Sequence, residues 1–165
     1  MIWQEHHRII IPTVLVLSLT GTTACSSPAP EKVTYQSSPI VADSGTHPAV
    51  AVARKMIGTP YRYGGTSPER GFDCSGLVHY AFKHAGINAP RSTETLFHSA
   101  FPVEGDALQQ GDLLFFRIEG KISHVGIYIG GETFLHAPSS GKAVGYASLS
   151  NPYWQQRLIR AGRLF

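Results

Sequence analysis

The sequence predicts an α+β domain in which helices come first and an antiparallel β-sheet follows. Two observations lead to this fold class. Helical periodicity occurs only in the first part of residues 49–165, and short strand-like segments then follow one another with short connections. The composition, 42% hydrophobic and 15% charged, is typical of a folded globular protein. We therefore expect one folded domain over residues 49–165.

Two helices are expected in the first part of this domain. The first covers Ala49 to Ile57 and ends at Gly58. Residues 61–71 are typical of a loop. The second helix begins at Asp73, a favourable N-cap residue, and ends at Gly86. Its apolar stripe consists of Leu77, Val78, Ala81, Phe82 and Ala85.

Strand signals fill the second part. They cover residues 113–116, 124–130, 133–137 and 161–165. Gly130-Gly131 lies between two of these segments and indicates a hairpin turn. Because side chains alternate along a strand, His124, Gly126 and Tyr128 should share one face, with Val125 on the other.

An apolar run, residues 9–19, lies near the N-terminus and follows Arg8. It is shorter than the roughly 20 residues that span a bilayer and has the length of a signal-peptide core. Small residues and then Cys25 follow, which resembles the lipobox of bacterial lipoproteins. The resemblance implies a signal peptide over residues 1–24 and a lipid on Cys25. A plain secretory signal cleaved nearby is the alternative.

Residues 25–48 are rich in Ser and Pro and are predicted to form a tether. Ser26 and Ser27 follow Cys25 without an Asp, which in lipoproteins of Gram-negative bacteria points to the outer membrane. The expected location is therefore the periplasmic face of the cell envelope, with the lipid as membrane anchor. The net charge of +3 and the absence of Lys/Arg runs indicate no nucleic-acid partner.

Cys74 lies in the segment GFDCSGLV, residues 71–78. With Asp73 as N-cap it falls in the first turn of a helix, where backbone N–H groups and the helix dipole favour an anion. We expect this position to lower the thiol pKa and to populate the reactive thiolate. Gly71 and Gly76 would leave room for another chain beside the sulfur. A buried structural cysteine is the alternative.

A thiolate nucleophile needs a base, and the base needs a partner that orients it. His124 opens the expected strand 124–130, and His136 lies on the strand that follows the hairpin turn. Each histidine alone is as compatible with a solvent-exposed or core position. Together, on adjacent strands and downstream of a cysteine at a helix start, they indicate a catalytic pair.

Several motifs occur in an order that resembles NlpC-type peptidoglycan endopeptidases. The resemblance covers residues 49–165 and implies a reduced papain-like fold, in which a helix bearing the cysteine packs on an antiparallel sheet bearing the histidines. It also implies a cysteine peptidase that cuts cell-wall stem peptides through an acyl-enzyme, without metal or other cofactor. The motifs are GTPYRYGG (58–65), FDCSG (72–76), PRST (90–93), GDLLFF (111–116), SHVGIYIG (123–130), FLHA (134–137) and NPYWQQR (151–157).

By position in these motifs, Cys74 matches the nucleophile, His124 the base and His136 the residue that orients the base. Tyr61 matches a tyrosine whose hydroxyl supports the oxyanion, with the backbone N–H of Cys74. Tyr63 suits that role less well.

Four further residues resemble contacts to the stem peptide: Asp73, Ser75, Arg91 and Ser92. Asp112 is expected to be a turn residue at the start of a strand, not a catalyst. No disulfide between Cys25 and Cys74 is expected, because lipidation would consume one thiol and catalysis requires the other.

The resemblance does not determine which amide bond of the stem peptides is cut. PYRYGG and NPYW look closest to proteobacterial murein endopeptidases, which favours the D-Ala–diaminopimelate crosslink over the γ-D-glutamyl–diaminopimelate bond within one stem. A zinc site of Cys74, His124 and His136 is a rival, but the HExxH and Cys-x2-Cys spacings are absent. A non-catalytic wall-binding lipoprotein is another rival, which would not need these three residues. An acyltransferase on the same fold is a third, although such relatives place His before Cys.

Overall fold

The computed structural model describes residues 45–164. The predictions for the signal peptide, for Cys25 and for most of the tether lie outside the described residues. Within residues 45–164, no helix has the length and apolar character needed to cross a membrane. The described helices are α1 (Pro48–Arg54), α2 (Cys74–His84), α3 (Thr93–Ser99), the short α4 (Pro152–Gln155) and the 3-10 turn η1 (Gly105–Ala107).

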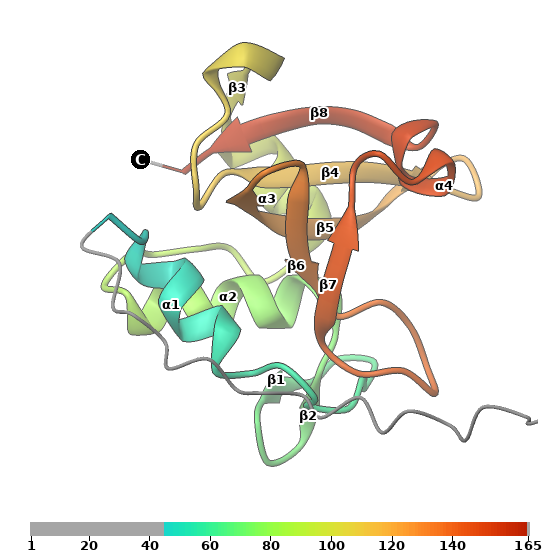
Figure 1. The fold of residues 1–165 in the computed structure, drawn as a ribbon. Helices are drawn as coiled ribbons and strands as arrows, with labels where there is room; N and C mark the ends of the chain where they lie inside the picture. The colour runs from blue at the N-terminus through green and yellow to red at the C-terminus, as the bar shows by residue number, and fades with distance from the viewer. Residues whose placement is uncertain (1–44, 165) are drawn as a thin grey trace, which may run out of the picture. The chain divides into compact units, whose positions relative to one another are not determined.

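Six strands form an antiparallel sheet in the order β3-β8-β4-β5-β6-β7 (Figure 1). The C-terminal strand β8 thus inserts between β3 and β4, while β4 to β7 follow the order of the chain. The α+β class and the antiparallel sheet are confirmed. The strands are β3 (Phe101–Val103), β4 (Leu113–Ile118), β5 (Lys121–Gly130), β6 (Thr133–His136), β7 (Gly145–Ser148) and β8 (Leu158–Arg163), with a separate small pair of β1 (Thr66–Ser67) and β2 (Gly71–Phe72).

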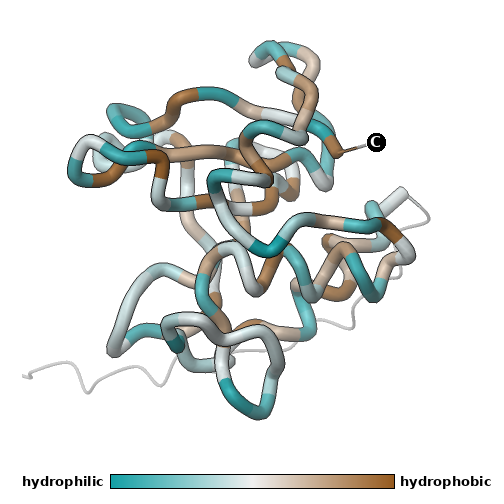
Figure 2. The backbone as a smooth tube through the Cα atoms, turned by 180° about the vertical axis from the view of Figure 1, so that it is seen from behind, coloured by the Kyte–Doolittle hydropathy of each residue, from teal (hydrophilic) through white to brown (hydrophobic). Residues whose placement is uncertain are grey.

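Each face of the sheet contributes side chains to a separate hydrophobic cluster. Helix α1 packs on α2, and both α2 and α3 pack against β5 (Figure 1). Val125 and Ile127 belong to the larger cluster beneath these helices, whereas Tyr128 belongs to a smaller cluster with Phe116 and Trp154. The predicted alternation along β5 is therefore confirmed. Brown, hydrophobic stretches run through the central strands in Figure 2, as this burial requires.

Several predicted boundaries are wrong by up to three residues, among them the start of β8, which lies at Leu158 instead of Ala161. Helix α1 ends at Arg54, and residues 55–58 form turns before Gly58 reaches a φ of +85°. Strand β5 begins at Lys121 instead of His124, because it pairs with β4 as far as Ile118.

The hairpin turn between β5 and β6 consists of Gly131-Glu132 instead of Gly130-Gly131. Gly130 pairs with Thr133, so it belongs to the strand. Both turn residues have positive φ, +56° and +58°. This is the requirement of the tight hairpin turn whose twist matches that of the strands.

Candidate active site

Cys74 is the first residue of α2. The Asp73 carboxylate accepts the backbone N–H of Gly76 at 2.6 Å, which confirms Asp73 as the N-cap. Gly76 allows a close approach of the loop that precedes the helix, because a Cβ there would lie 2.0 Å from the backbone oxygen of Gly65. The space predicted beside the cysteine is thus filled by residues of the preceding loop.

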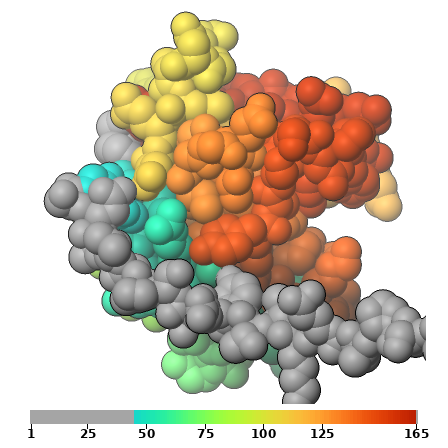
Figure 3. All heavy atoms as spheres, in the orientation of Figure 1, coloured from blue at the N-terminus to red at the C-terminus, as the bar shows by residue number. Residues whose placement is uncertain are grey.

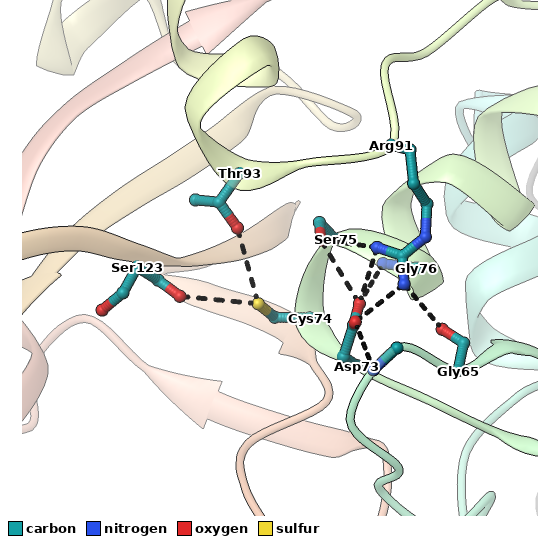
Figure 4. A network of polar contacts seen from close by, with 9 residues as sticks. Gly65, Asp73, Cys74, Ser75, Gly76, Arg91, Thr93 and Ser123 are labelled. Carbon is teal, nitrogen blue, oxygen red and sulfur yellow. Dashed lines mark hydrogen bonds and ion pairs between the residues drawn. The ribbon is translucent and has the colours of Figure 1, made fainter.

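The sulfur of Cys74 lies where three elements converge (Figure 4). Its Sγ is 3.6 Å from the hydroxyl of Thr93 at the start of α3, and the thiol donates to the backbone oxygen of Ser123 on β5 at 3.7 Å. Cys74 is 9% exposed. Neither Thr93 nor Ser123 was among the predicted site residues, although both lie in the motifs.

The expected lowering of the thiol pKa is not what the structure indicates. Burial raises the pKa of Cys74, and the charge of Asp73 acts in the same direction. Hydrogen bonding from Thr93 and from the backbones of Val125 and Ser75 acts in the opposite direction without overcoming burial. The sulfur is therefore a thiol until a base removes its proton.

His124 on β5 and His136 on β6 form a buried pair. Nε2 of His124 lies 2.8 Å from Nδ1 of His136, and the two residues are 3% and 5% exposed. The pKa of His124 is lowered to about 3, mainly by burial and to a smaller extent by the charge of His136. The pKa of His136 is lowered to about 4, mainly by burial and to a smaller extent by the charge of Lys142. Both rings are therefore neutral at neutral pH.

The hydrogen bond also determines which nitrogen of His124 can act as a base. If Nε2 of His124 carries the hydrogen and donates it to Nδ1 of His136, then Nδ1 of His124 is free to accept a proton. The predicted pairing of these two histidines across the hairpin is present.

Trp154 covers the histidine pair. Its indole stacks on His124, with ring centroids 5.2 Å apart and an angle of 25°, and meets His136 edge-on at 4.9 Å. It also packs on Phe116 and Phe134. The indole comes from α4, which Asn151 caps by accepting the N–H of Tyr153.

On the other side of the sulfur, Asp73, Ser75 and Arg91 form a polar network (Figure 4). Arg91 binds both oxygens of Asp73, at 3.0 and 2.7 Å, and donates to the Ser75 hydroxyl at 2.9 Å. Asp73 also accepts the backbone N–H groups of Gly76 and Gly64. Ser92 caps α3 by accepting the N–H of Thr95 at 3.1 Å. All four residues expected to contact the substrate therefore form hydrogen bonds with one another or with the backbone.

Two adjoining cavities meet at Cys74, Tyr61 and Ser123. One, which we name the histidine cavity, has a volume of about 420 Å³, and a notch between α4 and the β6–β7 loop marks it on the right of Figure 3. The other, the arginine cavity, has a volume of about 330 Å³. The histidine cavity is lined by Tyr61, Cys74, Ile118, Ser123, His124, Pro138, Ser139, Lys142, Asn151, Tyr153 and Trp154. The arginine cavity is lined by Tyr61, Tyr63, Gly64, Asp73, Cys74, Ser75, Arg91, Ser92, Thr93 and Ser123.

The family model described as the NlpC/P60 family matches residues 58–163. The chain belongs to the NlpC/P60 family. The membership expected from the motifs is therefore confirmed, and so is the fold it implies, with the cysteine on a helix and the histidines on an antiparallel sheet.

Three similar proteins illustrate this NlpC/P60 membership. The chain is 44% identical over 115 residues to murein DD-endopeptidase MepH of Escherichia coli K12 (67% of this chain, 42% of MepH). It is 41% identical over 115 residues to the bifunctional muramidase/DL-endopeptidase CwlT of Bacillus subtilis 168 (68% and 34%). A crystal structure of a Staphylococcus aureus Mu50 protein, similar to lipoprotein and of the NLP/P60 family, superposes with a TM-score of 0.66 at 38% identity (72% and 41%). The chain spans less than half of each of these proteins.

In this NlpC/P60 domain Asp112 has a structural position, as the sequence predicted. Its carboxylate is fully buried, accepts the backbone N–H of Gln109 at 2.8 Å and binds Arg163 on β8 at 2.6 Å. It lines neither cavity. Nowhere in residues 45–164 are three His, Cys, Asp or Glu side chains grouped so that they could hold a metal ion.

Sequence reasoning missed four residues that surround the sulfur and the histidine pair. Thr93 and Ser123 contact the thiol, Trp154 covers the imidazoles, and Lys142 lies in the histidine cavity. Thr93, Ser123 and Trp154 lie inside recognised motifs and Lys142 lies between two of them, but no local pattern indicates which long-range neighbour such a residue will meet.

Proposed function

We propose that this chain is a peptidoglycan endopeptidase that hydrolyses an amide bond of cell-wall stem peptides, with Cys74 as nucleophile and His124 as base. The observation that carries the proposal is that the buried Cys74 and the neutral His124 line one cleft, with His136 hydrogen-bonded to His124 behind it. Membership of the NlpC/P60 family and the similarity to endopeptidases such as MepH support the substrate class.

Because thiol and imidazole are both neutral at rest, the reaction begins with a proton transfer. Nδ1 of His124 takes the proton of Cys74 as Sγ attacks the amide carbonyl. The resulting oxyanion is stabilised by the backbone N–H of Cys74, for which residues 45–164 provide no acceptor, and by the hydroxyl of Tyr61. The C–N bond then breaks as His124 gives its proton to the leaving amine. Water, activated by His124, hydrolyses the acyl-enzyme.

His136 orients the base. By accepting the hydrogen of Nε2 it holds the imidazole of His124 in the tautomer that leaves Nδ1 free, and it stabilises the imidazolium that forms during the reaction. Trp154 lies over this hydrogen bond and limits the access of water to it.

The position of His124 assigns the two halves of the substrate. The leaving amine must receive its proton from His124, so the amine side of the substrate occupies the histidine cavity. The acyl side occupies the arginine cavity, which His124 does not line. There the network of Asp73, Ser75 and Arg91, with Ser92, contacts the stem peptide through the groups that remain exposed.

The bond we propose is the D-Ala–diaminopimelate crosslink. Similarity to the DD-endopeptidase MepH, at 44% identity, and the PYRYGG and NPYW motifs support it. The γ-D-glutamyl–diaminopimelate bond is the second candidate, because CwlT, a DL-endopeptidase, is 41% identical.

The decisive experiment is digestion of purified peptidoglycan followed by mass spectrometry of the products. We expect the wild type to convert crosslinked dimers into monomers, and Cys74→Ala and His124→Ala to release nothing. The exposed Lys83→Ala variant should behave as wild type. Shortened stems instead of separated monomers would assign the within-stem bond. Equal turnover by Cys74→Ala and wild type would refute the assignment of the nucleophile.

The proposal also includes a lipid on Cys25 after removal of residues 1–24, a tether over residues 25–48 and a place on the periplasmic side of the outer membrane. It rests on the apolar run, the small residues and the Ser/Pro-rich stretch. Cys25→Ser should move the protein from the membrane fraction to the soluble periplasm, whereas Ser26→Ala should not. A wild type that is soluble in the periplasm would contradict the anchor.

A further inference from the structure

The histidine cavity contains one side chain with a permanent charge, Lys142. No Asp, Glu or Arg is among its lining residues. His124, the other basic residue there, is neutral because burial lowers its pKa to about 3. The arginine cavity differs, because the charges of Asp73 and Arg91 offset each other at 2.7 Å. Among the residues that line the amine side of the cleft, Lys142 is therefore the one whose side chain is charged at neutral pH.

The backbone of Lys142 is held in place at the edge of the cleft. Its backbone carbonyl accepts the backbone N–H of Tyr61 at 2.8 Å, and its own backbone N–H donates to the backbone oxygen of Ser139 at 3.1 Å. Next to it, Val144 donates to Thr59 at 2.9 Å. The β6–β7 loop is thus joined to the segment that carries Tyr61.

The side chain of Lys142, in contrast, is exposed and forms no ion pair with any residue from 45 to 164. Its charge nevertheless acts on the catalytic pair, since it contributes to the lowered pKa of His136. An ammonium group on a fixed backbone, without a counter-ion among residues 45–164, is suited to a carboxylate of the substrate.

The two candidate bonds present different groups to this position. In the crosslink, the scissile nitrogen is bonded to a carbon of diaminopimelate that also carries a free carboxylate. In the γ-D-glutamyl–diaminopimelate bond, the corresponding carboxyl group is amide-linked to D-Ala whenever the stem is longer than a tripeptide. A cation beside the leaving amine therefore meets a negative charge in the first case and a neutral amide in the second.

We propose that Lys142 binds the free carboxylate on the carbon that carries the scissile nitrogen, and so selects the crosslink. This inference rests on the proposed function, because it requires the leaving amine to occupy the histidine cavity. Lys142 is a specificity residue of the amine side and takes no part in the proton transfers of Cys74 and His124.

The test compares two crosslinked muropeptide dimers that differ only in whether the carboxylate next to the scissile nitrogen is free or amidated. For the wild type we expect kcat/KM to be about tenfold higher on the free carboxylate, as for one charge-assisted contact in a partly exposed site. Lys142→Met should lose about tenfold on this substrate and less than twofold on the amidated one. Lys142→Arg should keep the preference.

Lys83→Met is the matched control, because Lys83 is exposed and lines neither cavity. It should retain the wild-type ratio between the two substrates, and raising the salt concentration should reduce the wild-type ratio. If Lys142→Met loses the same factor on both dimers, or none on either, the inference is wrong while the proposed function stands. If the wild type cuts neither dimer nor any isolated stem, the proposed function fails and the inference fails with it.

Discussion

Replacing Trp154 by alanine tests how the covered histidine pair works. The indole lies 5.2 Å from the ring of His124, nearly parallel to it, and meets His136 edge-on. Removing it has two opposite effects on the pKa of His124. Water reaches the ring and favours the imidazolium, which raises the pKa, whereas loss of the stacked aromatic face removes a stabilising contact to the cation, which lowers it.

The relative sizes of these two effects decide whether the pKa of His124 rises or falls. Burial is the largest cause of the change in the pKa of His124 from 6.5 to about 3, which corresponds to about 5 kcal/mol at roughly 1.4 kcal/mol per pKa unit. A cation–aromatic contact contributes about 0.5–2 kcal/mol. Even if Trp154 accounts for only half of the burial effect, about 2.5 kcal/mol, hydration exceeds the lost contact. We expect the pKa of His124 to rise by about one unit.

The assay is kcat/KM on a crosslinked muropeptide as a function of pH, restricted to the range in which each variant is folded. For Trp154→Ala the acid limb should move upward by about one unit. Near pH 7, kcat/KM should fall about tenfold, a fraction of the full general-base contribution, because the imidazole of His124 loses the ring that holds it in position. Trp154→Phe keeps an aromatic face and should lie between. Tyr146→Ala, which removes an exposed aromatic residue that lines neither cavity, should leave the profile unchanged. An acid limb of Trp154→Ala that stays in place or moves to lower pH would refute this reasoning.

Three further predictions concern the histidine pair and the buried ion pair of Asp112 and Arg163. His136→Asn should keep about a tenth to a hundredth of wild-type turnover and His136→Ala less, because an amide oxygen can still accept the hydrogen of His124 Nε2; equal turnover of the two variants would contradict the orienting role. In urea unfolding, stability should be highest above about pH 6.5 and decrease as the pH falls toward 4, because the folded pKa values of His124 and His136, about 3 and about 4, lie below the ordinary 6.5. A free energy of unfolding that does not change between pH 6.5 and pH 4 would contradict this prediction. Arg163→Ala should lower the free energy of unfolding by about 3 kcal/mol, because it leaves the buried carboxylate of Asp112 without its partner; the exposed Arg70→Ala is the control, and equal stability of both would exclude this role.

Local features of the sequence were sufficient for the parts of the fold that depend on near neighbours. Asp73 begins α2 because its carboxylate reaches an N–H three residues ahead, so the position of Cys74 could be predicted. The alternation along β5 put His124 and Val125 on opposite faces, as observed: Val125 belongs to the larger cluster, and His124 packs on Phe116 and Trp154 of the smaller one. The hairpin then brought His136 to His124, even though the turn lies one residue later than predicted.

The tertiary structure decided what depends on residues far apart in the chain. Sequence reasoning gave the wrong direction for the pKa of Cys74, because the helix start is a local effect, whereas burial beneath Thr93 and β5 is not. Trp154 and Lys142 come from segments that follow the histidine hairpin and reach the site only through folding of the chain. Periodicity and capping act over a few residues, but desolvation and charge act through space, so the protonation states of this site exist only in the folded molecule.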